Sequence, residues 1–192
     1  MKPLTLTAQD ALLIVDVQND FLPGGALAVP AGDAVIAPLN RWIERFRAAG
    51  LPIIASRDWH PVDHCSFSPQ GGPWPPHCIA GSAGAAFAAA LALPDDAWVI
   101  SKAAAKDAEA YSAFAGTDLY TRLQGRGIRR LFVGGLATDY CVKNTVLDAL
   151  RLGYAVRLLT DAIRAVDVRP GDGERALAEM AAAGAEPWAG TP

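Results

Sequence analysis

The segment ALLIVD at residues 11–16 decides the fold. Its first five residues are all apolar, and a short unbroken apolar run is typical of a strand buried on both faces of a parallel sheet. Asp16 ends the run with a carboxylate, a group that is costly to bury without a partner. The segment therefore predicts a central strand whose carboxyl end carries a charged side chain.

Four further apolar runs predict strands of the same kind, at residues 52–55, 97–100, 131–133 and 154–159. Amphipathic stretches between and after them predict helices at residues 33–49, 118–124, 138–151 and 173–183. The residues beyond 183 form a short tail rich in Gly and Pro, to which we assign no element. This alternation of strand and helix favours an α/β fold with helices on both faces of the sheet. We expect three layers around a mostly parallel, doubly wound sheet of about five to six strands.

The composition is that of one globular domain. The chain has 192 residues and 52% hydrophobic content, and no linker or repeat divides residues 1–192. A net charge of −3 without a basic cluster argues against nucleic-acid and membrane partners. The first apolar run is too short for a signal peptide or a membrane span, and the odd count of three cysteines suggests reduced thiols in the cytoplasm. The sequence leaves the oligomeric state open, a homo-oligomer included.

Polar residues lie at the ends of four predicted strands. Asp16 closes the first strand, Asp58 and His60 follow the second, Lys102 follows the third, and Cys141 opens the helix after the fourth. Ligands of open parallel sheets bind outside the carboxyl ends of the strands. We therefore expect these side chains to converge on one crevice.

All three histidines lie in one proline-rich stretch, residues 58–84, and loops of that length are usually functional. Together with Asp58, His60 and His77 offer two imidazoles and one carboxylate, a donor set that suits Zn²⁺, Fe²⁺ or Mn²⁺. The alternative is that Asp58 caps a turn and the histidines are solvated. Their clustering favours one divalent metal ion.

Cys141 lies in a glycine-containing bend between a strand and a helix. A helix N-terminus favours a thiolate, and its unpaired N–H groups could receive an oxyanion. The alternative is a small buried apolar residue, which is how we interpret Cys65 and Cys78. Asp16 and Lys102 beside such a thiol would serve proton removal and charge compensation, whereas either residue alone is equally well explained by a structural ion pair.

Five motifs carry a resemblance to a known family. They are DVQNDF at residues 16–21, DWHP at 58–61, WPPHC at 74–78, Lys102, and GLATDYCV at 135–142. In this order they resemble nicotinamidases of the isochorismatase-like cysteine hydrolase superfamily, over nearly the whole chain. The Asp58, His60 and His77 set is the more specific part, because it is similar to a metal site that many other members of the superfamily lack.

The resemblance implies roles for individual residues. It implies a catalytic triad of Asp16, Lys102 and Cys141. It implies that Asp58, His60 and His77 bind the metal, most readily zinc with iron or manganese as alternatives, and that His64 is a candidate fourth ligand. It implies an oxyanion hole of the Ala137 and Cys141 amides, with a cis peptide between Leu136 and Ala137. Phe21, Trp74 and Tyr111 resemble the walls of a ring-binding pocket, with core packing as their alternative.

The activity implied by the resemblance is metal-dependent hydrolysis of nicotinamide to nicotinic acid and ammonia through a thioester at Cys141. Pyrazinamide would be a further substrate, and the reaction would belong to NAD salvage. Three alternatives stay open: an amidase for another small amide or carbamoyl compound, a non-haem iron oxygenase, and a catalytically silent binding protein on the same fold.

Overall fold

The computed structural model describes residues 5–189, and these contain a parallel sheet of six strands. The strands are β1 (Asp10–Val15), β2 (Ile53–Asp58), β3 (Trp98–Lys102), β4 (Arg130–Leu136), β5 (Ala155–Arg164) and β6 (Glu186–Trp188). Their order in the sheet is β3-β2-β1-β4-β5-β6, and every neighbouring pair is parallel. The α/β fold with a doubly wound sheet is thus confirmed.

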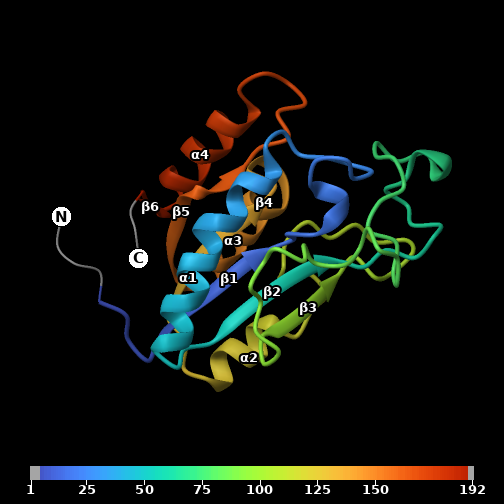
Figure 1. Ribbon diagram of the computed structural model, residues 1–192. Coiled ribbons are helices and arrows are strands. Elements are labelled where there is room, and N and C mark those ends of the chain that lie inside the picture. Colours follow the sequence, from blue (N-terminus) through green and yellow to red (C-terminus); the bar gives the residue numbers. More distant parts are fainter. Residues whose placement is uncertain (1–4, 190–192) are drawn as a thin grey trace.

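Helices cover both faces of the sheet (Figure 1). They are α1 (Ile36–Ala48), α2 (Leu119–Gly125), α3 (Lys143–Arg151) and α4 (Asp172–Ala182). Leu12 and Ile14 of β1 share a core with α1, whereas Leu13 and Val15 share the opposite core with α2 and α3. Successive side chains of a strand point to opposite faces, and both faces are covered. This double coverage explains the unbroken apolar run at residues 11–15.

The sheet has a topological switch point between β1 and β4. The chain runs outward from β1 through β2 to β3, then crosses back to pair β4 with the other side of β1. Val15 and Gly135 are aligned across this junction. Gly135 has a φ of 123°, and a Cβ there would lie 2.0 Å from the Val15 carbonyl oxygen, so only glycine fits. Such a switch point opens a crevice at the carboxyl ends of the strands.

Several boundaries differ from the prediction. Strand β6 was not predicted, because its three residues include Pro187 and it exists only through pairing with β5. The predicted helix at 138–151 begins as a π-helical turn, Thr138–Val142, before α3. Likewise, a 3₁₀ turn, Gly32–Val35, precedes α1. Tertiary contacts determine where these elements begin and end, so a local sequence pattern does not predict their boundaries.

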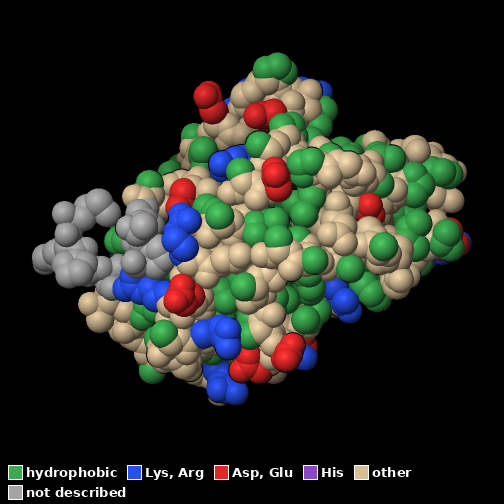
Figure 2. Space-filling model, viewed as in Figure 1, with side chains coloured by type: hydrophobic (Ala, Val, Ile, Leu, Met, Phe, Trp, Pro, Cys, Tyr) green, Lys and Arg blue, Asp and Glu red, His purple; other side chains and the backbone are tan. Residues whose placement is uncertain are grey.

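The long segment after β2 lies at the carboxyl ends of β1, β2 and β3 (Figure 1). Two isolated bridges order it, one between His60 and Ile79 and one between Phe67 and Trp74. On the face shown in Figure 2, basic and acidic side chains are interspersed. Among residues 5–189, no helix has both the length and the apolar character needed to cross a lipid bilayer.

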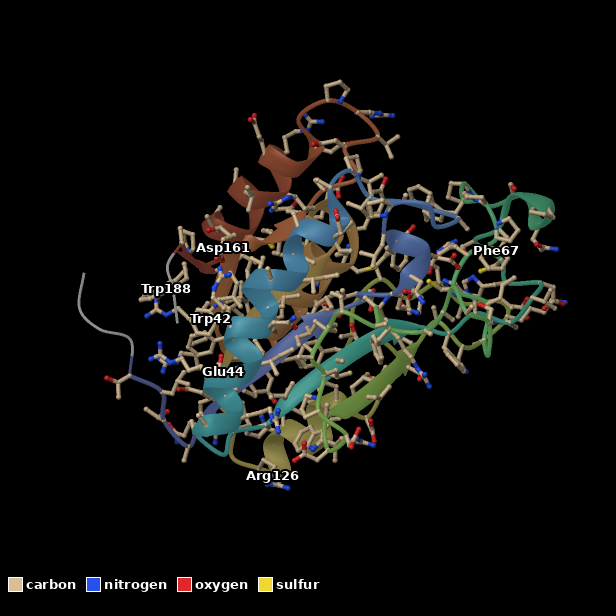
Figure 3. All side chains as sticks on the ribbon, in the orientation of Figure 1. Trp42, Glu44, Phe67, Arg126, Asp161 and Trp188 are labelled. Atoms are coloured by element: carbon tan, nitrogen blue, oxygen red, sulfur yellow. The ribbon has the colours of Figure 1, made fainter. Side chains whose placement is uncertain are left out.

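The packing of α1 rests on an aromatic cluster. Trp42, Phe46 and Phe132 are fully buried, and their ring centroids lie 5.3 to 6.3 Å apart. Figure 3 shows Trp42 on α1, over the sheet. We expect Phe46→Ala to lower the free energy of unfolding by about 3–5 kcal/mol in chemical denaturation, because it leaves a cavity. Leu177→Ala on the exposed side of α4 is the control, with a change below about 1 kcal/mol. A Phe46→Ala protein as stable as the parent would contradict this packing.

Candidate active site

Asp16 lies directly after β1 and is completely buried. Its Oδ1 accepts a hydrogen bond of 2.7 Å from the hydroxyl of Ser56 on β2. Its Oδ2 lies 3.0 Å from the Lys102 ammonium, yet it accepts no aligned hydrogen bond from any residue within 5–189. One side of the carboxylate is therefore fixed, and the other side is available to a proton donor.

Lys102, the last residue of β3, is buried at the centre of the site. Its ammonium contacts Asp16 at 3.0 Å, the Cys141 Sγ at 3.4 Å, the Ala110 carbonyl oxygen at 3.1 Å, and the Asp58 carboxylate. Burial alone would lower the pKa of this lysine, but the carboxylates of Asp16 and Asp58 outweigh burial and raise the pKa well above its usual value. Lys102 is therefore a fixed cation.

Cys141 lies in the π-helical turn after β4 and is 6% exposed. Burial raises the pKa of its thiol well above the usual value; Lys102 opposes this, and the Asp16 and Asp58 carboxylates add to it. This direction is opposite to the one that a helix N-terminus alone would favour. Burial also raises the pKa of Asp16, more than Lys102 lowers it. A thiol thus faces a carboxylate of raised proton affinity.

Asp58, His60 and His77 form a second group in the same site. Their potential ligand atoms all lie within 4.8 Å of one another, and the three residues are at most 5% exposed. The Nδ1 atom of His60 lies 3.1 Å from the Ala103 carbonyl oxygen, and that of His77 lies 2.8 Å from the Pro75 carbonyl oxygen. A carbonyl oxygen only accepts, so each Nδ1 carries the proton and each Nε2 offers a lone pair.

The ionisation of Asp58 completes this donor set. Burial would raise the pKa of its carboxyl group, but Lys102 and His60 outweigh burial and hold the pKa below its usual range. One ionised carboxylate and two imidazoles, each oriented through its second nitrogen, fit a divalent cation such as Zn²⁺. Asp58 also links the metal-binding group to Asp16 and Cys141, because its carboxylate contacts the Lys102 ammonium.

The structure does not bring His64 into this group of three. Its Nδ1 lies 2.7 Å from the Ser66 hydroxyl and its Nε2 lies 3.1 Å from the Ala108 carbonyl oxygen. The His64 and His60 rings lie 4.2 Å apart. Both nitrogens of His64 therefore have protein partners, and its ring packs beside a member of the group.

A pocket opens over both groups. Phe21, Trp74 and Tyr111 line it together with Cys141, and the Trp74 indole donates a hydrogen bond of 3.1 Å to the Tyr111 hydroxyl. The sequence-based reasoning missed other lining residues: Leu27, Val29, Glu109, Tyr140 and Val166. Only Tyr140, beside Cys141 in a quoted motif, carried a usable signal. The others come from irregular segments without periodicity.

Phe67 is a further residue that sequence reasoning missed. It is fully buried, and its ring lies 5.4 Å from the rings of His60 and His77 (Figure 3 labels Phe67 in the long loop). It thereby packs the imidazoles in place. The peptide between Leu136 and Ala137 is cis, as the resemblance implied.

The whole site falls within a region that matches one family. The family model of the isochorismatase domain matches residues 10–190. A nicotinamidase of Escherichia coli (strain K12) is 44% identical over 196 residues, covering 91% of this chain and 92% of the relative.

Solved structures agree with this assignment. The pyrazinamidase of Pyrococcus horikoshii in complex with zinc is 49% identical with a TM-score of 0.90, covering 94% of this chain and 98% of that chain. PnC1 from L. infantum in complex with nicotinate is 40% identical with a TM-score of 0.89, covering 96% of this chain and 95% of that chain. The family model matches residues 10–190 and the solved structure covers 94% of this chain, so this chain belongs to the isochorismatase family.

Proposed function

We propose that this protein is a metal-dependent nicotinamidase that hydrolyses nicotinamide to nicotinic acid and ammonia and also accepts pyrazinamide. One observation carries the proposal: the Lys102 ammonium joins the Asp16 and Cys141 pair to Asp58 of the metal-binding group. A nucleophile and a metal site therefore share one pocket. The relatives named nicotinamidase and pyrazinamidase, one of them in complex with zinc, support the substrate and favour zinc.

The pocket suits a small aromatic amide. Phe21, Leu27 and Val29 give it apolar walls, and Trp74 and Tyr111 add two aromatic rings. A flat ring buries apolar area against such walls, and the few polar groups fix its orientation. The reacting carboxamide would lie over Cys141, at the buried end of the pocket.

In the first step, Oδ2 of Asp16 accepts the thiol proton of Cys141. The thiolate attacks the carboxamide carbon, and the amides of Ala137 and Cys141 hold the oxyanion. Asp16 returns the proton to the leaving nitrogen as the C–N bond breaks, which releases ammonia and leaves a thioester. Lys102 balances the charge that moves between the carboxylate and the sulfur.

In the second step, water attacks the thioester carbon. Asp16 takes one proton from this water and returns it to the sulfur as the C–S bond breaks, which releases the carboxylic acid and restores the thiol. Asp58, His60 and His77 would hold a divalent cation beside this site. When bound, such a cation supplies Lewis acidity toward water or a ring nitrogen.

The first prediction from this proposal concerns the nucleophile. Cys141→Ala removes the only atom of the site that can form the thioester, so we expect ammonia release from nicotinamide to fall by at least about 10⁴-fold, to background. Bound metal should stay at the parent's content, because Sγ is not one of the three donors. Cys65→Ala, a partly buried cysteine outside the catalytic group, is the matched control and should retain activity. Turnover by Cys141→Ala would exclude the thioester route.

The second prediction concerns the metal. Chelation should abolish ammonia release, and adding back Zn²⁺, Fe²⁺ or Mn²⁺ in turn should restore it to different extents. The same assay, run with nicotinamide, pyrazinamide and aliphatic or carbamoyl amides, separates this reaction from that of another amidase. Full activity after complete metal removal would contradict the proposal. Oxygen consumption in place of ammonia release would instead favour an oxygenase.

The third prediction separates the histidines. His77→Ala removes a donor whose Nε2 is free, so we expect metal affinity to fall by more than about 100-fold. His64→Gln removes a ring whose nitrogens already have protein partners. The loss of metal affinity should therefore be smaller than that of His77→Ala by about tenfold or more. Competition with a chromophoric chelator measures both. A greater loss from His64→Gln would make His64 a ligand.

A further inference from the structure

The turn after β1 carries three polar residues that the proposed reaction does not use. They are Gln18, Asn19 and Asp20, in the motif that also contains Asp16. Gln18 is completely buried, Asp20 is half-buried and Asn19 is exposed. A buried amide is costly unless its polar atoms are paired, so the partners of Gln18 show what the buried side chain does.

Gln18 holds the backbone of Asp58 from both sides of its Cα atom. Its Nε2 donates to the Asp58 carbonyl oxygen at 2.8 Å, and its Oε1 accepts from the Asp58 N–H at 2.8 Å. The Nε2 also donates to the Ala85 carbonyl oxygen at 2.9 Å. The pairing of β1 with β2 ends at Val15 and Ser56, so the Gln18 amide takes the place that a strand neighbour would have beside Asp58.

Asp20 holds the segment of the second ligand. Its Oδ2 accepts a hydrogen bond of 2.7 Å from the N–H of Cys78, the residue after His77. Cys78 has a φ of 46°, a conformation that non-glycine residues seldom adopt without local support. A Cβ on Gly84 would lie 2.1 Å from the same Oδ2, so the loop is shaped around this carboxylate.

We infer that Gln18 and Asp20 are positioning residues for the metal site: Gln18 sets the direction of the Asp58 carboxylate, and Asp20 sets the backbone that presents His77. The inference rests on the proposed metal ligands and not on the identity of the amide substrate. Metal affinity depends on ligand geometry, and removing a group that orients a ligand weakens affinity by about 10–100-fold.

The test compares three variants by their Zn²⁺ dissociation constants, measured by competition with a chelator, and by the melting temperatures of their metal-free forms. Gln18→Met keeps the length of the side chain and removes its three hydrogen bonds. Asp20→Asn keeps the shape and weakens the acceptor for Cys78. Asn19→Ala is the matched control, because Asn19 lies in the same turn and donates at 2.8 Å to Ala83, outside both ligand segments.

We expect Gln18→Met to weaken Zn²⁺ binding by about 10–100-fold and Asp20→Asn to weaken it in the same direction. Asn19→Ala should stay within about twofold of the parent, whatever its melting temperature. Parental affinity in both Gln18→Met and Asp20→Asn overturns the inference, even if both melt earlier, because their role is then only structural. If Gln18→Met does not fold, Asp20→Asn decides the question.

The outcome is separable from that of the proposed function. If the parent binds Zn²⁺ but releases no ammonia from nicotinamide, the proposed substrate fails, while the affinities of the variants still support or overturn this inference. If the parent binds no divalent metal, the inference and the metal site fail together.

Discussion

A buried ammonium between two carboxylates is the interaction on which the rest of this structure depends. Lys102 is inaccessible to solvent, and so are its partner Asp16 and most of Asp58. Taking such charges out of water costs several kcal/mol per ion, and removing one partner of a buried pair typically costs about 3–5 kcal/mol. These residues come from the ends of β3, β1 and β2. The ion cluster is therefore satisfied only when the three strands are in register, and the register in turn brings the reactive groups together.

Because the strands are parallel and in register, the residues at their carboxyl ends form one site. Asp58 and Lys102 are direct neighbours across β2 and β3, and the switch point places Cys141 beyond β4, next to Asp16 beyond β1. The helices behind the two faces fix the strands but supply few reacting groups. The reactive groups are thus concentrated at the carboxyl ends of the strands. Backbone pairing between the strands ends there, and side chains such as Gln18 pair with the backbone groups that it leaves free.

The local sequence pattern predicted those structural features that short segments of the chain determine by themselves. The strand at residues 11–15 and the residues at the strand ends follow from apolar runs and from the geometry of parallel sheets. Strand β6 was not predictable, because three residues with a proline become a strand only by pairing with β5. Phe67 and Val166 reach the site from irregular segments, where no periodicity marks burial. The sequence shows the helix start near Cys141 but not the burial that raises the pKa of its thiol.

That burial has a chemical consequence. Because burial and the two carboxylates raise the pKa of the Cys141 thiol, its reactivity in the proposed mechanism depends on transfer of its proton to Asp16. Ser56 donates to one oxygen of Asp16, whereas the other oxygen lies 3.0 Å from the Lys102 ammonium. The transfer creates a thiolate and a neutral acid next to a fixed cation, so no net charge enters or leaves the buried site. The opposite charges of the ion cluster must compensate each other for the protein to fold. The net charge of the site also stays unchanged during the proton transfer that the proposed reaction requires.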